Sequence, residues 1–91
     1  MIITIYSDRG HGWGKVNKAL LSKLGIADKI SHYSYMREGK AYLEEDVDLS
    51  ILITALTDAG IQFRFEERTT DKMSRIRNYD RYVYEALDKV N

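Results

Sequence analysis

Three of the six glycines lie in one short segment, residues 8–15, together with the only tryptophan, Trp13, and with His11. A β-branched run at residues 2–7 precedes this segment and indicates a strand, while apolar residues at helical spacing follow it. Glycine tolerates positive φ and lets the backbone approach a ligand, and the N-terminus of a following helix attracts anions. We therefore expect a strand, a binding loop and a helix in that order.

The glycine loop matches no complete phosphate-binding motif. A Walker A pattern would need a glycine at Arg9 and a Ser or Thr at Val16, and the dinucleotide fingerprint needs a wider spacing of its last glycine. Arg9, Lys15 and the backbone N–H groups still predict a generic anion site, with His11 and Trp13 beside it. The structural alternative is a tight turn in which Trp13 packs under the helix.

The composition predicts a single globular domain over residues 1–91, with 44% hydrophobic and 31% charged residues. The chain has no cysteine, which excludes disulfides and thiolate metal sites and is typical of a reducing cytoplasm. It shows neither an apolar run of membrane-spanning length nor a signal peptide, so we expect a cytoplasmic protein. Fourteen basic residues balance fourteen acidic ones, which argues against non-specific nucleic-acid binding as the main function.

The order of predicted elements is that of the ferredoxin-like βαββαβ fold, of the α+β class. We expect a four-stranded antiparallel sheet with two helices on one face, followed by a C-terminal helix. A two-residue hairpin is predicted at Glu38-Gly39. The predicted strands are residues 2–7, 33–37, 40–44 and 61–67, and the predicted helices are residues 16–24, 48–59 and 79–90.

Strand alternation predicts that several tyrosines share the sheet face away from the helices. The hairpin register places Tyr35 opposite Tyr42, Arg37 opposite Lys40 and Tyr33 opposite Glu44. Tyrosines interleaved with cations form a stacking surface of the kind found in single-strand binders. The alternative is that the C-terminal helix or a second copy of the chain covers this face. The side chains predicted to share the face are Tyr6, Tyr33, Tyr35, Arg37, Lys40, Tyr42 and Arg64.

Two charged segments are further candidates. Arg75 and Arg77 belong to the one local basic cluster, which suits an extended arm or a phosphate-binding loop, or else a solvated surface. The acidic run at residues 44–48 precedes a predicted helix, where carboxylates complement the helix dipole and cap its N–H groups. A basic protein partner or a hard cation is the alternative ligand of this run. The two histidines are too few and too far apart to define a metal site.

Several segments together resemble a group of small bacteriophage-encoded proteins of unknown function, and the resemblance covers residues 2–79. It implies an accessory protein made in the cytoplasm of a bacterial host, and it supplies no reaction, cofactor or catalytic residue. Small phage accessory proteins often neutralise host machinery, including immune systems, by stoichiometric binding. The segments are Asp8-x-Gly10-His11-Gly12-Trp13-x-Lys15-Val16, Ile30-Ser31-x-Tyr33-Ser34-Tyr35, Tyr42-Leu43-Glu44-Glu45-Asp46-x-Asp48 and Ser74-Arg75-Ile76-Arg77-x-Tyr79.

The chain is also similar, more weakly, to the small metal-dependent nucleases of CRISPR adaptation. They share a ferredoxin-like fold, a similar length and an aspartate at the end of the first strand, which Asp8 would provide. In that family the aspartate directly follows a hydrophobic-Tyr pair, whereas Ser7 intervenes here. The glycine loop is not part of the nuclease pattern either, which puts catalysis by Asp8 in doubt.

We predict a non-catalytic binding protein, without cofactor, that sequesters or inhibits a host factor, such as a defence component, or a small anionic ligand. One alternative is an RNA or single-stranded DNA binder that uses the tyrosine face. The other is a magnesium- or manganese-dependent nuclease with Asp8 as the metal ligand. We also expect a homo-oligomer, formed through the tyrosine face or an edge strand. The predicted binding residues are Arg9, His11, Trp13, Lys15, Tyr35, Tyr42, Arg75 and Arg77.

Overall fold

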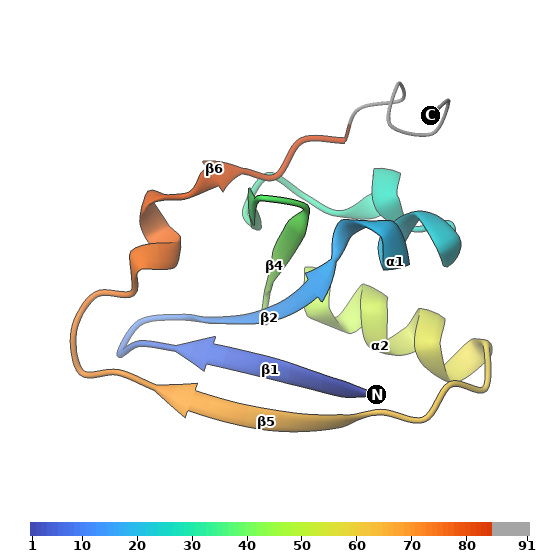
Figure 1. The fold of residues 1–91 in the computed structure, drawn as a ribbon, viewed down its shortest axis with the longest axis horizontal. Helices are drawn as coiled ribbons and strands as arrows, with labels where there is room; N and C mark the ends of the chain where they lie inside the picture. The colour runs from blue at the N-terminus through green and yellow to red at the C-terminus, as the bar shows by residue number, and fades with distance from the viewer. Residues whose placement is uncertain (85–91) are drawn as a thin grey trace.

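The computed structural model describes residues 1–84 and shows an α+β fold built on a six-stranded mixed sheet (Figure 1). The strand order is β5-β1-β2-β4-β3-β6, in which β5 runs parallel to β1 and the other neighbours are antiparallel. The elements are β1 (Ile2–Ser7), β2 (Gly12–Asn17), α1 (Lys18–Lys23), η1 (Ala27–Lys29), β3 (Tyr35–Arg37), β4 (Lys40–Glu44), α2 (Asp48–Asp58), β5 (Arg64–Thr69), η2 (Arg75–Asn78) and β6 (Asp80–Arg81).

The glycine segment joins two strands and not a strand and a helix, so the predicted four-stranded ferredoxin-like sheet is wrong. β2 pairs antiparallel with β1 and continues to Asn17, which moves Val16 from the expected helix into the sheet. The alternation of β2 was hidden by its glycines. Gly14 faces the helices, where a Cβ atom would lie only 2.7 Å from Leu49 Cδ1 of α2, so the absence of a side chain lets α2 approach the sheet.

The predicted C-terminal helix is also wrong over the part that the structure describes. Residues 80–81 form β6, and Tyr79 just before it has extended backbone angles. Tyr82 then turns to the helix side of the sheet, where its hydroxyl donates to the carbonyl of Ala27 (2.6 Å). Tyr79 and Tyr82 therefore pack on opposite sides of the sheet, which a helical stripe does not allow. Residues 85–90 of the predicted helix lie outside the described residues.

The hairpin between β3 and β4 follows the prediction. Tyr35 pairs with Tyr42 and Arg37 with Lys40. Glu38 and Gly39 both have positive φ, 50° and 79°, as a type I′ turn requires. Tyr33, however, lies before the start of β3, is 65% exposed and does not pair with Glu44.

Both helices pack on one face of the sheet, as predicted, and enclose an aliphatic core (Figure 1). The fully buried side chains of this core are Ile3, Leu21, Leu43, Leu52 and Leu56. Within residues 1–84, no helix has the length and apolar character needed to cross a membrane.

Candidate functional site

The sheet face away from the helices is partly covered by a segment of the chain itself, residues 70–79, called here the crossing segment (Figure 1). Ile76 of this segment is only 3% exposed and packs with Trp13, Tyr35 and Tyr42. The ring of Tyr79 lies 5.1 Å from the ring of Tyr42. The cover that the sequence predicted for this face is therefore present, but it is an irregular segment and not the C-terminal helix. Trp13 accordingly packs away from the helices and not under one.

Asp8 fixes the crossing segment to the glycine loop. Its carboxylate accepts hydrogen bonds from Arg77 Nε (2.7 Å) and Nη2 (2.8 Å) and from the backbone N–H of Ser74 (2.9 Å). The N–H groups of Gly10 and His11 donate to the same carboxylate from the loop. The Arg77 guanidinium, followed by the Ser74 N–H, holds the pKa of Asp8 well below its usual range. Asp8 therefore ties together two segments that lie far apart in the sequence.

This position gives Asp8 a structural role, which differs from the metal-ligand role of the nuclease alternative. Its side chain is 2% exposed, and each of its carboxylate oxygens already accepts at least two hydrogen bonds. Across residues 1–84, no three His, Asp or Glu side chains come together in a way that could hold a metal ion. The geometry therefore gives no support to a nuclease mechanism that depends on Asp8.

Three arginines on this face lie over aromatic rings. Arg77 lies 5.3 Å from the centre of the Trp13 ring, and Arg81 lies 4.7 Å from that of Tyr35. Arg37 lies 5.0 Å from the centre of the Tyr79 ring. Such contacts stabilise the packing of aromatic residues and use the arginine charge locally. These three arginines therefore help to hold the covered face together.

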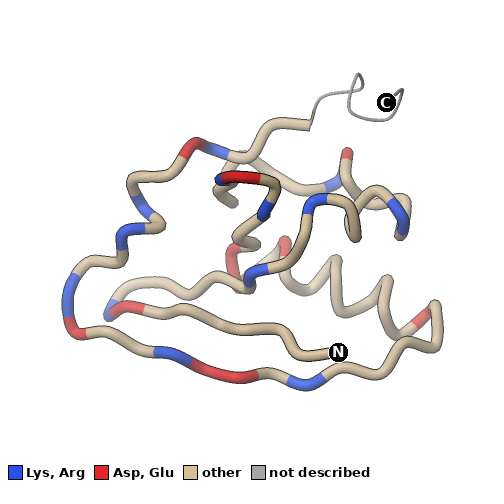
Figure 2. The backbone as a smooth tube through the Cα atoms, in the orientation of Figure 1, with Lys and Arg blue, Asp and Glu red and all other residues tan. Residues whose placement is uncertain are grey.

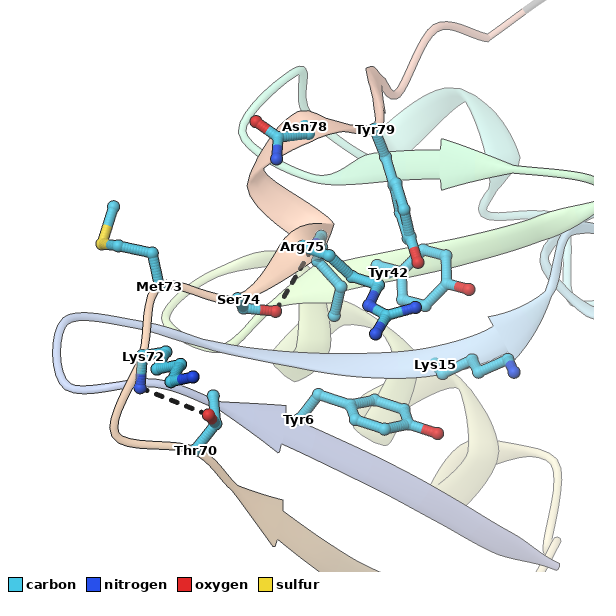
Figure 3. A pocket seen from close by; sticks show the side chains of 11 residues that line it. Tyr6, Lys15, Tyr42, Thr70, Lys72, Met73, Ser74, Arg75, Asn78 and Tyr79 are labelled. Carbon is cyan, nitrogen blue, oxygen red and sulfur yellow. Dashed lines mark hydrogen bonds between the residues drawn. The ribbon is translucent and has the colours of Figure 1, made fainter.

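A pocket of about 670 Å³ lies where the crossing segment leaves the sheet uncovered (Figure 3). We call it the tyrosine pocket. It has three cationic side chains and no carboxylate among its lining residues, and none of these cations forms an ion pair within the described part of the chain. Tyr6, Lys15 and Tyr42 line it from the sheet, and Lys72, Arg75 and Tyr79 line it from the crossing segment.

The sheet register and a short turn place these side chains. Lys15 pairs with Tyr42 across β2 and β4, so both lie on the same face of the sheet. In the crossing segment the Ser74 hydroxyl accepts a hydrogen bond from the Ile76 N–H at the start of η2. Figure 3 shows Arg75 directed toward Tyr42 from this turn. The crossing segment has one acidic residue, Asp71, followed by the basic residues Lys72, Arg75 and Arg77. Figure 2 shows these basic positions in blue along this part of the chain.

Tyr42 lines the tyrosine pocket from the sheet and is 7% exposed. Burial raises the pKa of its hydroxyl, and the neighbouring Tyr79 and Tyr6 raise it further. The hydroxyl therefore stays neutral at physiological pH and does not oppose the binding of an anion.

The structure separates the predicted binding residues into groups. Lys15, Tyr42 and Arg75 meet in the tyrosine pocket. A second hollow, of about 450 Å³, is lined by four other predicted residues, His11, Trp13, Tyr35 and Arg77, together with Glu44 and Arg81. Arg9 is exposed and lines neither the tyrosine pocket nor this second hollow. The predicted loop site therefore does not form as one unit.

Three aromatic or cationic lining residues of the tyrosine pocket, Tyr6, Lys72 and Tyr79, were not among the predicted binding residues. Tyr6 was predicted only as part of the tyrosine face, Lys72 lay near the basic cluster in a stretch typical of a solvated surface, and Tyr79 fitted the stripe of a helix that the structure does not contain. The nearest signal was the basic cluster that singled out Arg75 as part of a phosphate-binding loop.

The acidic run has a structural role, in agreement with the helix-capping interpretation. The Glu44 carboxylate accepts hydrogen bonds from the N–H groups of Asp46, Val47 and Asp48 at the start of α2. Burial alone would raise the pKa of Glu44, but these three hydrogen bonds outweigh it and lower the pKa. Asp48 is fully buried and accepts from the hydroxyls of Ser31 and Ser34.

The expected oligomer contact changes with this geometry. Trp13, Tyr35 and Tyr42 are covered by the chain itself, so they do not offer a second copy an open aromatic surface. All six residues of the edge strand β5 are exposed, and a homo-oligomer through this edge stays a prediction. The charges of β5 are of the kind that protect edge strands from pairing.

No protein-family model, curated protein or solved structure significantly matches this chain. Its function is therefore inferred from the geometry of its own residues.

Proposed function

We propose that this protein is a non-catalytic binding protein that captures a small anionic ligand in the tyrosine pocket. The observation that carries the proposal is the presence of Lys15, Lys72 and Arg75 among the lining residues without any carboxylate. In a chain with zero net charge, such a local excess of positive charge requires that acidic residues be kept elsewhere. A bound anion would neutralise this positive charge.

The shape of the pocket supports a small ligand over a protein partner. Its volume of about 670 Å³ is within the range of ligand sites, and tyrosine rings and a few polar groups converge on it. The accessory role implied by the phage resemblance fits stoichiometric capture of such a ligand in a host cell, and it is part of the proposal.

Binding of single-stranded nucleic acid across the whole tyrosine face has less support. Stacking of successive bases needs open rings, whereas Trp13, Tyr35 and Tyr42 are 2%, 8% and 7% exposed beneath the crossing segment. Of the described tyrosines that line the pocket, only the half-buried rings of Tyr6 and Tyr79 remain accessible, and the exposed Tyr33 lies outside it. Two rings in a concave pocket favour a compact ligand.

The test is a titration with tripolyphosphate, an anion without a ring, followed by calorimetry and by thermal unfolding. We expect stoichiometric binding that weakens with added salt and that raises Tm. Arg75→Gln should weaken binding roughly tenfold, because it removes hydrogen bonds to a charged ligand. Arg64→Gln, an exposed arginine of β5 outside the pocket, is the matched control and should leave the affinity unchanged. Equal losses in the two variants would contradict the proposed site.

A further inference from the structure

The ring of Tyr6 differs from the rings of Tyr42 and Tyr79 in the tyrosine pocket, because within residues 1–84 no other ring or cation lies over its face. Tyr42 and Tyr79 contact each other, and Arg37 lies over Tyr79. Tyr6 is half-buried at the edge of the same cluster, and in the described part of the chain it has neither a ring partner nor a cation over its face. An aromatic face that the protein leaves unpaired inside a pocket is suited to stack against a planar group of a ligand.

The cations of the pocket are spread along it and do not converge on one point. In Figure 3, Lys72 lies toward one end beside Thr70, Lys15 lies toward the other end, and the Arg75 guanidinium lies between them. The Tyr6 ring lies below Arg75 in this view. A single inorganic phosphate would meet only part of this charge, whereas a ligand with several negative groups in a row can meet more of it.

The geometry points to a nucleotide as the ligand, with its base stacked on Tyr6 and a chain of two or more phosphates held by Lys15, Lys72 and Arg75. This inference rests on the proposed function and adds the chemical class of the ligand. Lys72 and Arg75 belong to the crossing segment, and Lys15 and Tyr6 belong to the sheet. A bound nucleotide would therefore contact both walls of the pocket.

The experiment compares ATP, tripolyphosphate and adenosine by calorimetry on the full-length chain at low salt. ATP should bind roughly 5- to 150-fold more tightly than tripolyphosphate, since stacking of one base is worth about 1–3 kcal/mol. Adenosine alone should bind weakly. Tyr6→Leu should bring ATP down to the affinity of tripolyphosphate and leave tripolyphosphate unchanged, whereas Tyr6→Phe, which keeps the ring, should retain the difference.

Tyr33→Leu is the matched control, because Tyr33 is an exposed tyrosine outside the tyrosine pocket, and it should leave the ATP affinity unchanged. Fluorescence of the buried Trp13 reports whether each variant is folded. Equal affinity of the wild-type chain for ATP and tripolyphosphate would overturn the nucleotide inference and leave the proposed anion site standing. Absence of binding by both would overturn the proposed function itself.

Discussion

The two faces of the sheet are packed with different kinds of side chain. On the helix face, aliphatic side chains of regular elements, such as Leu21, Leu43 and Leu52, are fully buried. On the opposite face, aromatic rings lie beneath an irregular segment that Asp8 and Arg77 hold in place. The first face depends on the area of apolar surface removed from water, whereas the second adds a few directional contacts to a smaller apolar cluster.

This difference explains why the candidate site lies where it does. The two helices bury the central strands β1, β2 and β4 on their side of the sheet, because their apolar stripes match these strands. The crossing segment anchors to the other side through Ile76 and Arg77 and leaves a pocket beside these anchors. The following predictions test whether the two faces contribute to stability and to binding as separately as this comparison implies.

Leu52→Ala is expected to have the largest effect, because it removes a fully buried side chain from the helix face. The free energy of unfolding should fall by about 3–5 kcal/mol, the sum of lost burial and a cavity that the core cannot close. Urea unfolding followed by circular dichroism measures it. A loss below about 1 kcal/mol would be close to that of a surface substitution and would contradict the packing of α2 on the sheet.

Ile76→Ala makes a similar deletion on the other face. We expect a loss of about 2 kcal/mol, at the lower end for a buried isoleucine, because the irregular segment can relax around the gap. The emission of Trp13, the only tryptophan, should shift to longer wavelength as water reaches it. Hydrogen exchange should rise in residues 70–79 and stay unchanged in α2. Val83→Ala, at a 51% exposed position, is the control. An equal rise in α2 would mean that the two faces unfold together.

Asp8→Asn tests the anchor between the glycine loop and the crossing segment. At neutral pH the substitution should cost roughly 1.5 kcal/mol, because the hydrogen bonds from Arg77 and Ser74 lose a charged acceptor. The folded-state pKa of Asp8 lies below the ordinary value of 3.8, so its contribution is present above that pH and is lost as the pH falls below it. The stabilities of the two chains should therefore converge in acid. A difference that stays constant down to about pH 2 would contradict an ionised anchor.

The helix face could largely be predicted from the sequence. The stripe of Leu49, Leu52 and Leu56 and the alternation of Ile3 and Ile5 in β1 are local patterns with a regular period, and Gly60 marks the end of α2 shortly after Asp58. The β3–β4 register followed from a two-residue turn. These elements are correct because their signals lie within a few residues of one another.

The other face could be predicted only in part. Its anchor joins Asp8 to Arg77, 69 residues apart, and no local pattern indicates such a pair. Glycines hid the period of β2, and Tyr79 was assigned to a helical stripe although the chain is extended there. Of the candidate pocket, the sequence identified Lys15, Tyr42 and Arg75 but not that they meet. Their meeting depends on where an irregular segment crosses the sheet.

The smallest expected effect is a gain, from Glu38→Asn in the turn between β3 and β4. Glu38 has a φ of 50°, a conformation that asparagine adopts more readily than glutamate, and Asn-Gly is the preferred pair for this turn. The substitution removes the Arg37–Glu38 ion pair, but its atoms are 4.0 Å apart and both side chains are more than half exposed, so its loss costs little.

We therefore expect Glu38→Asn to raise the free energy of unfolding by up to about 1 kcal/mol, measured by urea unfolding. This hairpin carries residues of both faces, but the substitution changes only its turn. The gain in stability should therefore appear without any change in Trp13 emission or in tripolyphosphate affinity. Arg37 keeps its place over the ring of Tyr79, so the wall of the tyrosine pocket is preserved. A stabilised variant with altered affinity would show that the pocket depends on the strain of this turn, and the separation between the sheet and its cover would then be incomplete.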